Sequence, residues 1–241
     1  MQICRGFTAE QWTVLRTRLV DKDGTILEDE NAWRCAVEVF ERRIRERFLS
    51  CICALERSDS LADIDVPATA PADCSSLPDD KCQEIVVPGF AILALCCLLI
   101  ETLQSFREQR IPSAQPVGPC TYPQGPCIRP EPATNEAFRK FLRLPAFGGA
   151  FSSSEVASRF VGGVRNGILH DAETRRWAIW RNEPSGEMVE KEGRGYALNR
   201  TAFRQAVTEE FERYLADLRT PENVDLRKRF VEKVDRIVKD C

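Results

Sequence analysis

Apolar residues recur every three or four positions along much of the chain, which is the spacing of one face of an α-helix. The pattern is clearest over residues 30–57, where charged side chains fill the remaining positions. The apolar face of this stretch consists of Trp33, Val37, Phe40, Ile44, Phe48, Cys51 and Leu55. The spacing predicts one long amphipathic helix here, and shorter helices over residues 8–20 and 134–144.

A second long helix is predicted over residues 88–110, with Pro88 at its first position, where proline is favoured. Its first three turns are apolar on nearly every side, within the run IVVPGFAILALCCLLI of residues 85–100. This run is short for a bilayer span and is followed by Glu101, so we expect a buried central helix rather than a membrane anchor.

The segment SSSEVASRFVGGVRNGILH predicts another helix over residues 153–170, with Ser152 and Glu155 at capping-box spacing. Its apolar ladder has four-residue steps and consists of Val156, Phe160, Val164 and Ile168. Three glycines, at positions 162, 163 and 167, weaken the helix by on the order of 1 kcal/mol each relative to alanine. We expect these glycines to admit the close approach of another helix, because glycine has no side chain.

Two alternating segments flank the turn sequence EPSG and predict a small β-hairpin over residues 177–198. Asn199 is placed to cap the next helix, whose apolar residues include Phe203, Val207, Phe211 and Leu218. Pro221 is expected at the first position of a last helix.

Two polar stretches, residues 58–84 and 111–134, predict loops. Cys120 and Cys127 in the second loop either form a disulfide, bind a ligand or remain inert surface thiols. The predicted fold class is mainly all-α, an antiparallel helical bundle with one β-hairpin. We expect an N-terminal helical extension, the bundle itself and a C-terminal helix, covering residues 1–30, 31–219 and 220–241.

The composition is that of a globular protein, with 43% hydrophobic residues and a formal net charge of −3, so the charge balance does not indicate a nucleic-acid binder. Eleven cysteines at irregular spacings are no disulfide framework and contain no zinc-binding pattern, which favours reduced, mostly buried thiols in a cytoplasmic protein. Motifs for dinucleotides or phosphate-binding loops are absent from the sequence. We therefore expect neither a metal nor another cofactor.

The segment RNGILH contains His170, the one histidine of the chain, together with Arg165 and Asn166. These groups suit RNA cleavage without a metal: a histidine moves protons, an arginine stabilises charge on the phosphate, and an asparagine positions it. Arg165 and His170 lie about 140° apart around a helix, and one histidine cannot be acid and base in one step. A twofold dimer would supply two such pairs. Alternatively, His170 has a structural role near a helix C-terminus, paired with Asp171.

Several segments resemble the HEPN superfamily, helical bundles that include many metal-independent endoribonucleases. The family signature is an arginine followed after four to six residues by a histidine, with Asn, Asp or His favoured directly after the arginine; here it reads R-N-G-I-L-H. The stretches WRCAVEVFERRIRERFL and PGFAILALCCLLIETLQSFRE are similar to the first long helix and the central helix of a bacterial branch. The resemblance covers roughly residues 30–57, 85–110 and 135–219.

The resemblance implies that Arg165 and His170 are catalytic and that Asn166 assists at the phosphate. Glu101 matches an acidic position of the central helix, where it would orient Arg165 or His170; otherwise it is a buried carboxylate neutralised by an arginine. The family also implies a homodimer with a composite site, and products with a 2′,3′-cyclic phosphate and a 5′-hydroxyl. Arginines near the motif would either bind the RNA backbone or form a solvated surface: Arg159, Arg175, Arg176 and Arg181.

The expected function is therefore a cytoplasmic endoribonuclease of bacterial stress response, antiviral defence or a toxin–antitoxin system. Its expected partners are RNA, a second copy of the chain, and an antitoxin or regulatory protein, with no membrane. The alternative is a non-catalytic HEPN-type binding or dimerisation module that takes a nucleotide or a partner protein in the same cleft.

Overall fold

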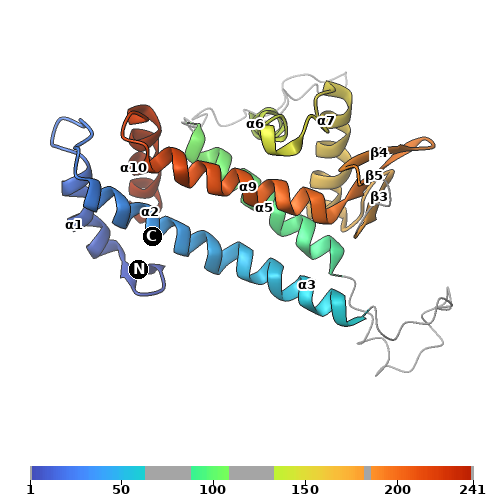
Figure 1. The fold of residues 1–241 in the computed structure, drawn as a ribbon, viewed down its shortest axis with the longest axis horizontal. Helices are drawn as coiled ribbons and strands as arrows, with labels where there is room; N and C mark the ends of the chain where they lie inside the picture. Colours follow the sequence, from blue (N-terminus) through green and yellow to red (C-terminus); the bar gives the residue numbers. More distant parts are fainter. Residues whose placement is uncertain (1, 63–87, 109–132, 182–185, 240–241) are drawn as a thin grey trace, which may run out of the picture.

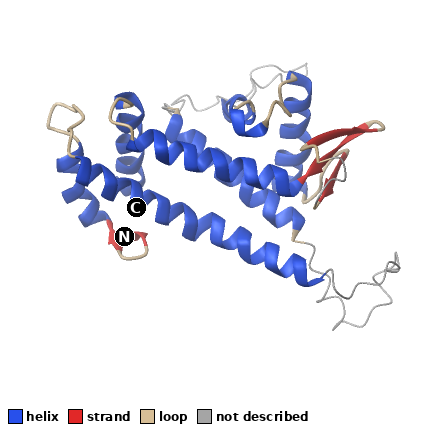
Figure 2. Ribbon diagram, in the orientation of Figure 1, coloured by secondary structure: helices blue, strands red, loops and turns tan. Residues whose placement is uncertain are grey.

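The computed structural model describes residues 2–62, 88–108, 133–181 and 186–239 and is mainly α-helical (Figure 1). Figure 2 shows that strands are confined to a small sheet beside the helices and a short pair near the N-terminus. Most of the two predicted loops, including Cys120 and Cys127, lies outside the described residues.

The N-terminal part contains a short strand pair, β1 (Gln2–Cys4) and β2 (Phe7–Thr8), followed by helix α1 (Ala9–Leu19). The predicted long helix begins at α2 (Glu30–Ile44), passes through a π-helical turn and continues as α3 (Ser50–Ala62). The Asp29 carboxylate accepts a hydrogen bond from the Ala32 amide at 2.9 Å and so caps α2. The amphipathic pattern therefore located this helix correctly.

The centre of the molecule is α5 (Gly89–Arg107), which lies between α2–α3 and α9 (Arg200–Arg219). α2–α3 runs antiparallel to α9. Three ion pairs show this, because their residue numbers rise along α2–α3 and fall along α9: Glu41–Arg219, Arg45–Glu212 and Glu56–Arg204. α5 and α9 begin at the same end, where a Cβ on Gly89 would lie 3.2 Å from Arg200 Nη1. In this bundle, α2–α3 is therefore antiparallel to α9, whereas α5 and α9 are parallel.

Among the described residues, α5 alone is long and apolar enough to cross a membrane. Most of its apolar side chains are buried in the protein core, which is the expected environment of a central helix. Two of its large apolar side chains remain exposed, Phe90 at 38% and Leu98 at 41%.

Aromatic side chains form much of the core, which runs without interruption from α1 to α10 (Val224–Lys239). The Phe40 ring contacts Phe106, Tyr214 and Phe230, with ring centroids 4.7, 5.7 and 5.5 Å away. A second aromatic group surrounds Phe160 and continues this core toward the small sheet. The C-terminal helix is therefore part of the same core as the helices before it.

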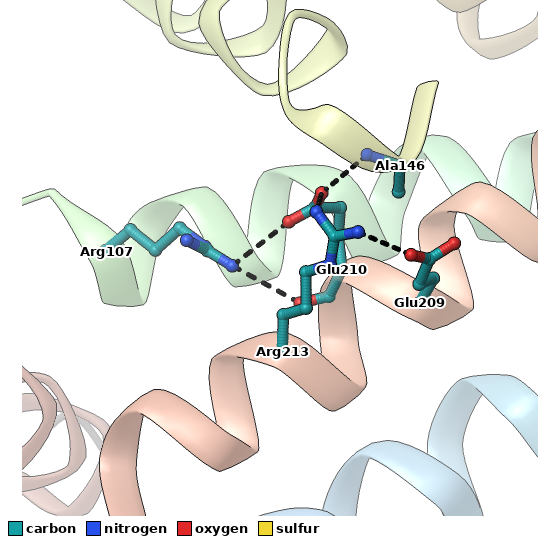
Figure 3. Close-up of polar contacts among 5 residues, drawn as sticks. All are labelled: Arg107, Ala146, Glu209, Glu210 and Arg213. Atoms are coloured by element: carbon teal, nitrogen blue, oxygen red, sulfur yellow. Dashed lines mark hydrogen bonds and ion pairs between the residues drawn. The ribbon is translucent and has the colours of Figure 1, made fainter. Parts of the chain in front are cut away.

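A buried carboxylate fixes the segment after α6 (Ala133–Leu142) to the central helices (Figure 3). Glu210 is 2% exposed and accepts a hydrogen bond from the Ala146 amide at 3.0 Å. Arg107 of α5 and Arg213 of α9 lie 3.5 and 3.3 Å from its oxygens. Since a buried carboxylate is tolerated only with such partners, this network determines how the segment docks.

The β-hairpin prediction is wrong in its pairing. β3 (Trp177–Trp180) and β4 (Val189–Glu192) do not pair with each other, because β5 (Gly195–Asn199) lies between them. β5 is parallel to β3 and antiparallel to β4. β5 is the central strand because its last three residues are buried, whereas the charged β4 is exposed and forms an edge of the sheet.

Helix termini differ from the prediction in three places. Pro88 precedes α5, which begins at Gly89, so this proline is not at the first helical position. Ser153, not Ser152, precedes α7 (Ser154–Phe160), and its side chain makes no capping hydrogen bond. Pro221 lies in a turn closed by a hydrogen bond from the Asn223 amide to the Thr220 carbonyl, so α10 begins only at Val224. The cap predicted for α9 is confirmed, since Asn199 accepts a hydrogen bond from the Ala202 amide at 3.0 Å.

We expect the thiols of α5 to resist alkylation in the folded protein. Burial raises the pKa of Cys96 to about 12 and holds the pKa of Cys97 well above its usual range, so both stay protonated at pH 8. Iodoacetamide at pH 8 followed by peptide mass spectrometry should label the exposed Cys51 and Cys53 and leave the α5 thiols unmodified until denaturant is added. Equal labelling of all four without denaturant would contradict the burial of α5.

Candidate functional site

Arg165 occupies the last position of a π-helical turn, Val161–Arg165, which joins α7 to α8 (Asn166–Asp171). A π turn contains one more residue than an α turn and recurs at functional sites. Val161 and Val164 of this turn are buried, while Arg165 is half-buried and extends to α5. The predicted single helix is therefore present but locally widened just before the motif.

The Arg165 guanidinium is held from two sides. Its Nε donates to Glu101 Oε1 at 2.7 Å, and its Nη2 donates to the same oxygen. Its Nη1 donates to Asn166 Oδ1 at 2.6 Å. A guanidinium has five N–H donors, so these contacts leave two, one on each Nη nitrogen, for another acceptor. The arginine is thus both fixed in position and able to bind an anion.

Glu101 interrupts an otherwise apolar part of α5, and this explains why it pairs with an arginine. Its side chain is 25% exposed and that of Arg165 is 15% exposed, so water screens the pair only in part. Of the roles considered for Glu101, the structure shows the ion pair with Arg165. Buried Cys97 lies one helical turn earlier on α5, and burial raises its pKa, which excludes a reactive thiolate there at neutral pH.

His170 lies in the last turn of α8 and is exposed. No described residue forms a hydrogen bond or an ion pair with its imidazole, which leaves both ring nitrogens accessible to a ligand. Pairing with Asp171 is not observed, because Asp171 forms an ion pair with Arg175 instead. Asn166 lies four residues before His170, on the same face of the helix.

The motif glycines have a different packing partner from the predicted one. A Cβ on Gly163 would lie 2.8 Å from the Arg175 carbonyl oxygen, and one on Gly167 would lie 2.3 Å from the Glu173 carbonyl oxygen. The two glycines therefore admit the chain's own segment after α8, not another helix. A Cβ on Gly162 would have no atom of the described residues within 4 Å beyond its own helix backbone.

The other arginines near the motif are in unlike environments. Arg159 forms an ion pair with Glu155, and Arg175 is neutralised by Asp171. Arg176 is exposed and has no hydrogen bond or ion pair with any described residue. Of the arginines expected to bind RNA backbone, Arg176 thus offers an uncompensated charge.

Sequence patterns did not single out Arg194, a second exposed arginine on the small sheet. It lies between Gly193, which has a positive φ of 53°, and Gly195. Glycines on both sides of an arginine were the available signal, since such a turn presents the central side chain to solvent.

Within the described ranges there is no cluster of three or more His, Cys, Asp or Glu side chains that could hold a metal ion. Comparisons with protein-family models, curated proteins and solved structures find no match to this chain. The resemblance to HEPN proteins therefore depends on the motif residues and their arrangement.

We expect the Glu101–Arg165 pair to contribute measurably to stability. Glu101→Gln removes the charge with little change of shape and leaves a largely buried guanidinium without a counterion, which should lower the free energy of unfolding by about 1–3 kcal/mol. The matched control is Glu155→Gln, whose ion pair with Arg159 is 63% and 47% exposed. That variant should lose less than about 1 kcal/mol. Urea unfolding at pH 7 measures the free energy of unfolding of both variants. Equal losses of this free energy would show that the Glu101–Arg165 pair is no stronger than a surface pair.

Proposed function

We propose that this protein is an endoribonuclease of the HEPN type, which cleaves RNA without a metal ion. The observation that carries the proposal is how Arg165 is held. Glu101 and Asn166 fix its guanidinium, and two of its N–H donors remain for another acceptor. The exposed His170 lies little more than one helical turn away. A fixed bidentate donor beside an accessible imidazole suits a phosphodiester.

The reaction follows from these groups. A base takes the proton of the ribose 2′-hydroxyl, whose oxygen attacks the adjacent phosphorus, and an acid gives a proton to the departing 5′-oxygen. The P–O5′ bond breaks as the P–O2′ bond forms, so the products carry a 2′,3′-cyclic phosphate and a 5′-hydroxyl. Arg165 stabilises the negative charge that builds on the non-bridging oxygens, and Asn166 holds the guanidinium in place.

A complete site requires two copies of the chain, because the sequence contains one histidine and the reaction needs both a base and an acid. Within one chain, Arg165 and His170 are separated by about 140° around the helix. A twofold axis near the motif would bring two pairs together. The exposed apolar side chains Phe90 and Leu98 on α5, the helix that carries Glu101, support an interface with a second copy.

The same site also fits the alternative, a non-catalytic binding or dimerisation module that takes a nucleotide or a partner protein; such a module could also hold RNA without cleaving it. One observation favours this alternative: no described residue orients the His170 imidazole, whereas general bases are usually held by a partner. The two functions differ in whether bound RNA is cut, so the experiment must measure binding and cleavage separately.

We expect the purified protein to cleave a mixed-sequence RNA in EDTA and to leave 2′,3′-cyclic phosphate ends. His170→Ala should lower the cleavage rate about 10²–10⁴-fold, because it removes the proton-transfer group. Arg165→Ala should lower it about 10²–10³-fold through lost charge stabilisation. The control is Arg34→Ala, an exposed arginine of α2 that bonds only Asn31. Fluorescence of a labelled RNA substrate gives the rates.

Two results would decide against the enzyme. Cleavage by His170→Ala at the wild-type rate would remove the proposed chemistry and point to a contaminating nuclease. RNA binding that depends on Arg165, with no cleavage over a range of pH, would assign the protein as the binding module.

A further inference from the structure

The small sheet contains an open depression of about 480 Å³, between the start of β3 and the turn before β5. Its shape depends on a close contact between two backbones. Arg176 has a positive φ of 60°, and its carbonyl accepts a hydrogen bond from the Tyr196 amide at 3.1 Å. A Cβ on Gly195 would lie 2.4 Å from this carbonyl oxygen, so only glycine fits there. Left-handed backbone at a non-glycine residue is costly and concentrates at binding sites.

Two uncompensated cations border the depression. Arg176 and Arg194 both line it, both are exposed, and neither forms a hydrogen bond or ion pair with any described residue. Neighbouring Arg159 and Arg175, by contrast, each pair with a carboxylate four residues earlier in the chain. Two free guanidinium groups at one hollow favour an anion with several oxygens, such as a phosphodiester.

Two aromatic rings support this part of the sheet from the face opposite to Glu192. Trp177 and Tyr196 stack with their ring centroids 4.9 Å apart and their planes 25° apart, and Tyr196 is half-buried at the surface. The Arg159 guanidinium lies 5.8 Å from the Tyr196 ring centroid, so the environment of this ring is cationic. The strand register pairs Tyr196 with Lys191 and Glu192 with Gly195, so the rings hold the strands in place from one face while Glu192 borders the depression on the other.

An acidic side chain in the same depression limits which ligands fit there. Glu192 lines it, is exposed and has no hydrogen bond or ion pair with a described residue. A carboxylate repels a phosphate but accepts hydrogen bonds from the exocyclic amine of a base. Glu192 would repel the side chains of an acidic peptide, whereas a nucleotide can place its base amine at Glu192 and its phosphate at the arginines, so a nucleotide with an amino-bearing base fits better.

The depression adjoins the motif helix. Trp177 Nε1 donates to the Arg159 carbonyl at 3.2 Å, and a Cβ on Gly163 would lie 2.8 Å from Trp177 Cδ1. The Trp177 ring therefore packs directly on the π-helical turn that ends at Arg165, and this contact fixes the sheet that carries the depression to the motif helix.

We propose that this depression is a second nucleotide subsite, in which Arg176 and Arg194 bind the backbone of a single RNA strand while the exocyclic amine of one base donates a hydrogen bond to Glu192. This inference rests on the proposed function, because the RNA strand bound in the depression is the one that continues to Arg165 and His170. The chemistry recognised, a phosphate joined to a base, is shared by an RNA strand and a free nucleotide, so the test must separate them.

The test measures binding of a fluorescein-labelled, 2′-O-methyl octanucleotide, which cannot be cleaved, to the full chain by anisotropy. Arg194→Gln should weaken binding about fivefold, and Arg176→Gln/Arg194→Gln at least about 20-fold, with a smaller dependence of affinity on salt because two phosphate contacts are lost. The matched control is Lys191→Gln, which removes an exposed cation from β4 outside the depression and should bind as the wild type does. An oligouridylate, which lacks exocyclic amines, should bind more weakly than an oligocytidylate, and Glu192→Gln should reduce that difference.

Three results would overturn the subsite. The first is equal affinity of the double arginine variant and Lys191→Gln. The second is competition by cytidine monophosphate as effective as that by the octanucleotide, which assigns a free nucleotide as ligand. The third is equally effective competition by a poly-glutamate peptide.

Cleavage of unmodified RNA tests the proposed function independently. If both proposals hold, the double arginine variant should keep its kcat and show a raised KM. Binding that depends on Arg176 and Arg194 without any cleavage would keep the subsite and remove the nuclease. Cleavage with an unchanged KM in the double variant would keep the nuclease and remove the subsite.

Discussion

A carboxylate in an apolar helix needs a cation, and this requirement organises the molecule around α5. Glu101 finds its counterion in Arg165, which comes from a helix 64 residues further along the chain. Because ion pairs of this kind are stable only with good geometry, the motif helix must dock on α5 in one register. The same contact that satisfies Glu101 fixes the guanidinium on which the proposed chemistry depends.

The small sheet packs on the same motif helix, through the π-helical turn and two of its glycines. Gly163 and Gly167 let the segment after α8 fold back against the helix, and Trp177 then packs on the widened turn. The sheet is thereby fixed to the helix that carries Arg165, although its edge strand and its two free arginines face solvent. If the proposed function holds, this connection fixes the distance between the strand bound at the sheet and the phosphodiester at the motif.

Local patterns predicted the features that depend on local physics. The 3.6-residue periodicity located α2–α3, α5 and α9, and the side chain of Asn199 identified a helix start, because a cap is a contact within three residues. The acidic interruption of α5 also indicated an ion pair, since a buried carboxylate has few alternatives. The resemblance singled out Arg165, which the structure places in that pair.

Features that depend on distant partners were not predictable in the same way. The pairing of β3 with β5 follows from which strand the core buries, and the alternation within each strand does not reveal it. The role of Gly163 depends on a carbonyl twelve residues later, and the left-handed backbone of Arg176 follows from its contact with β5. Pro221 was placed by a preference for first helical positions, but the turn between α9 and α10 is set by how the two helices pack.

The central claim is that a phosphodiester of RNA lies against Arg165 and His170. Because His170 is the one histidine in the sequence, its imidazole gives a unique nuclear magnetic resonance signal when the protein is prepared without a histidine tag. The decisive measurement is the chemical shift of the His170 imidazole protons by NMR, with and without a saturating 2′-O-methyl oligonucleotide. We expect bound RNA to shift these signals, because its phosphate lies against the imidazole. Unchanged signals in the RNA complex would contradict the central claim.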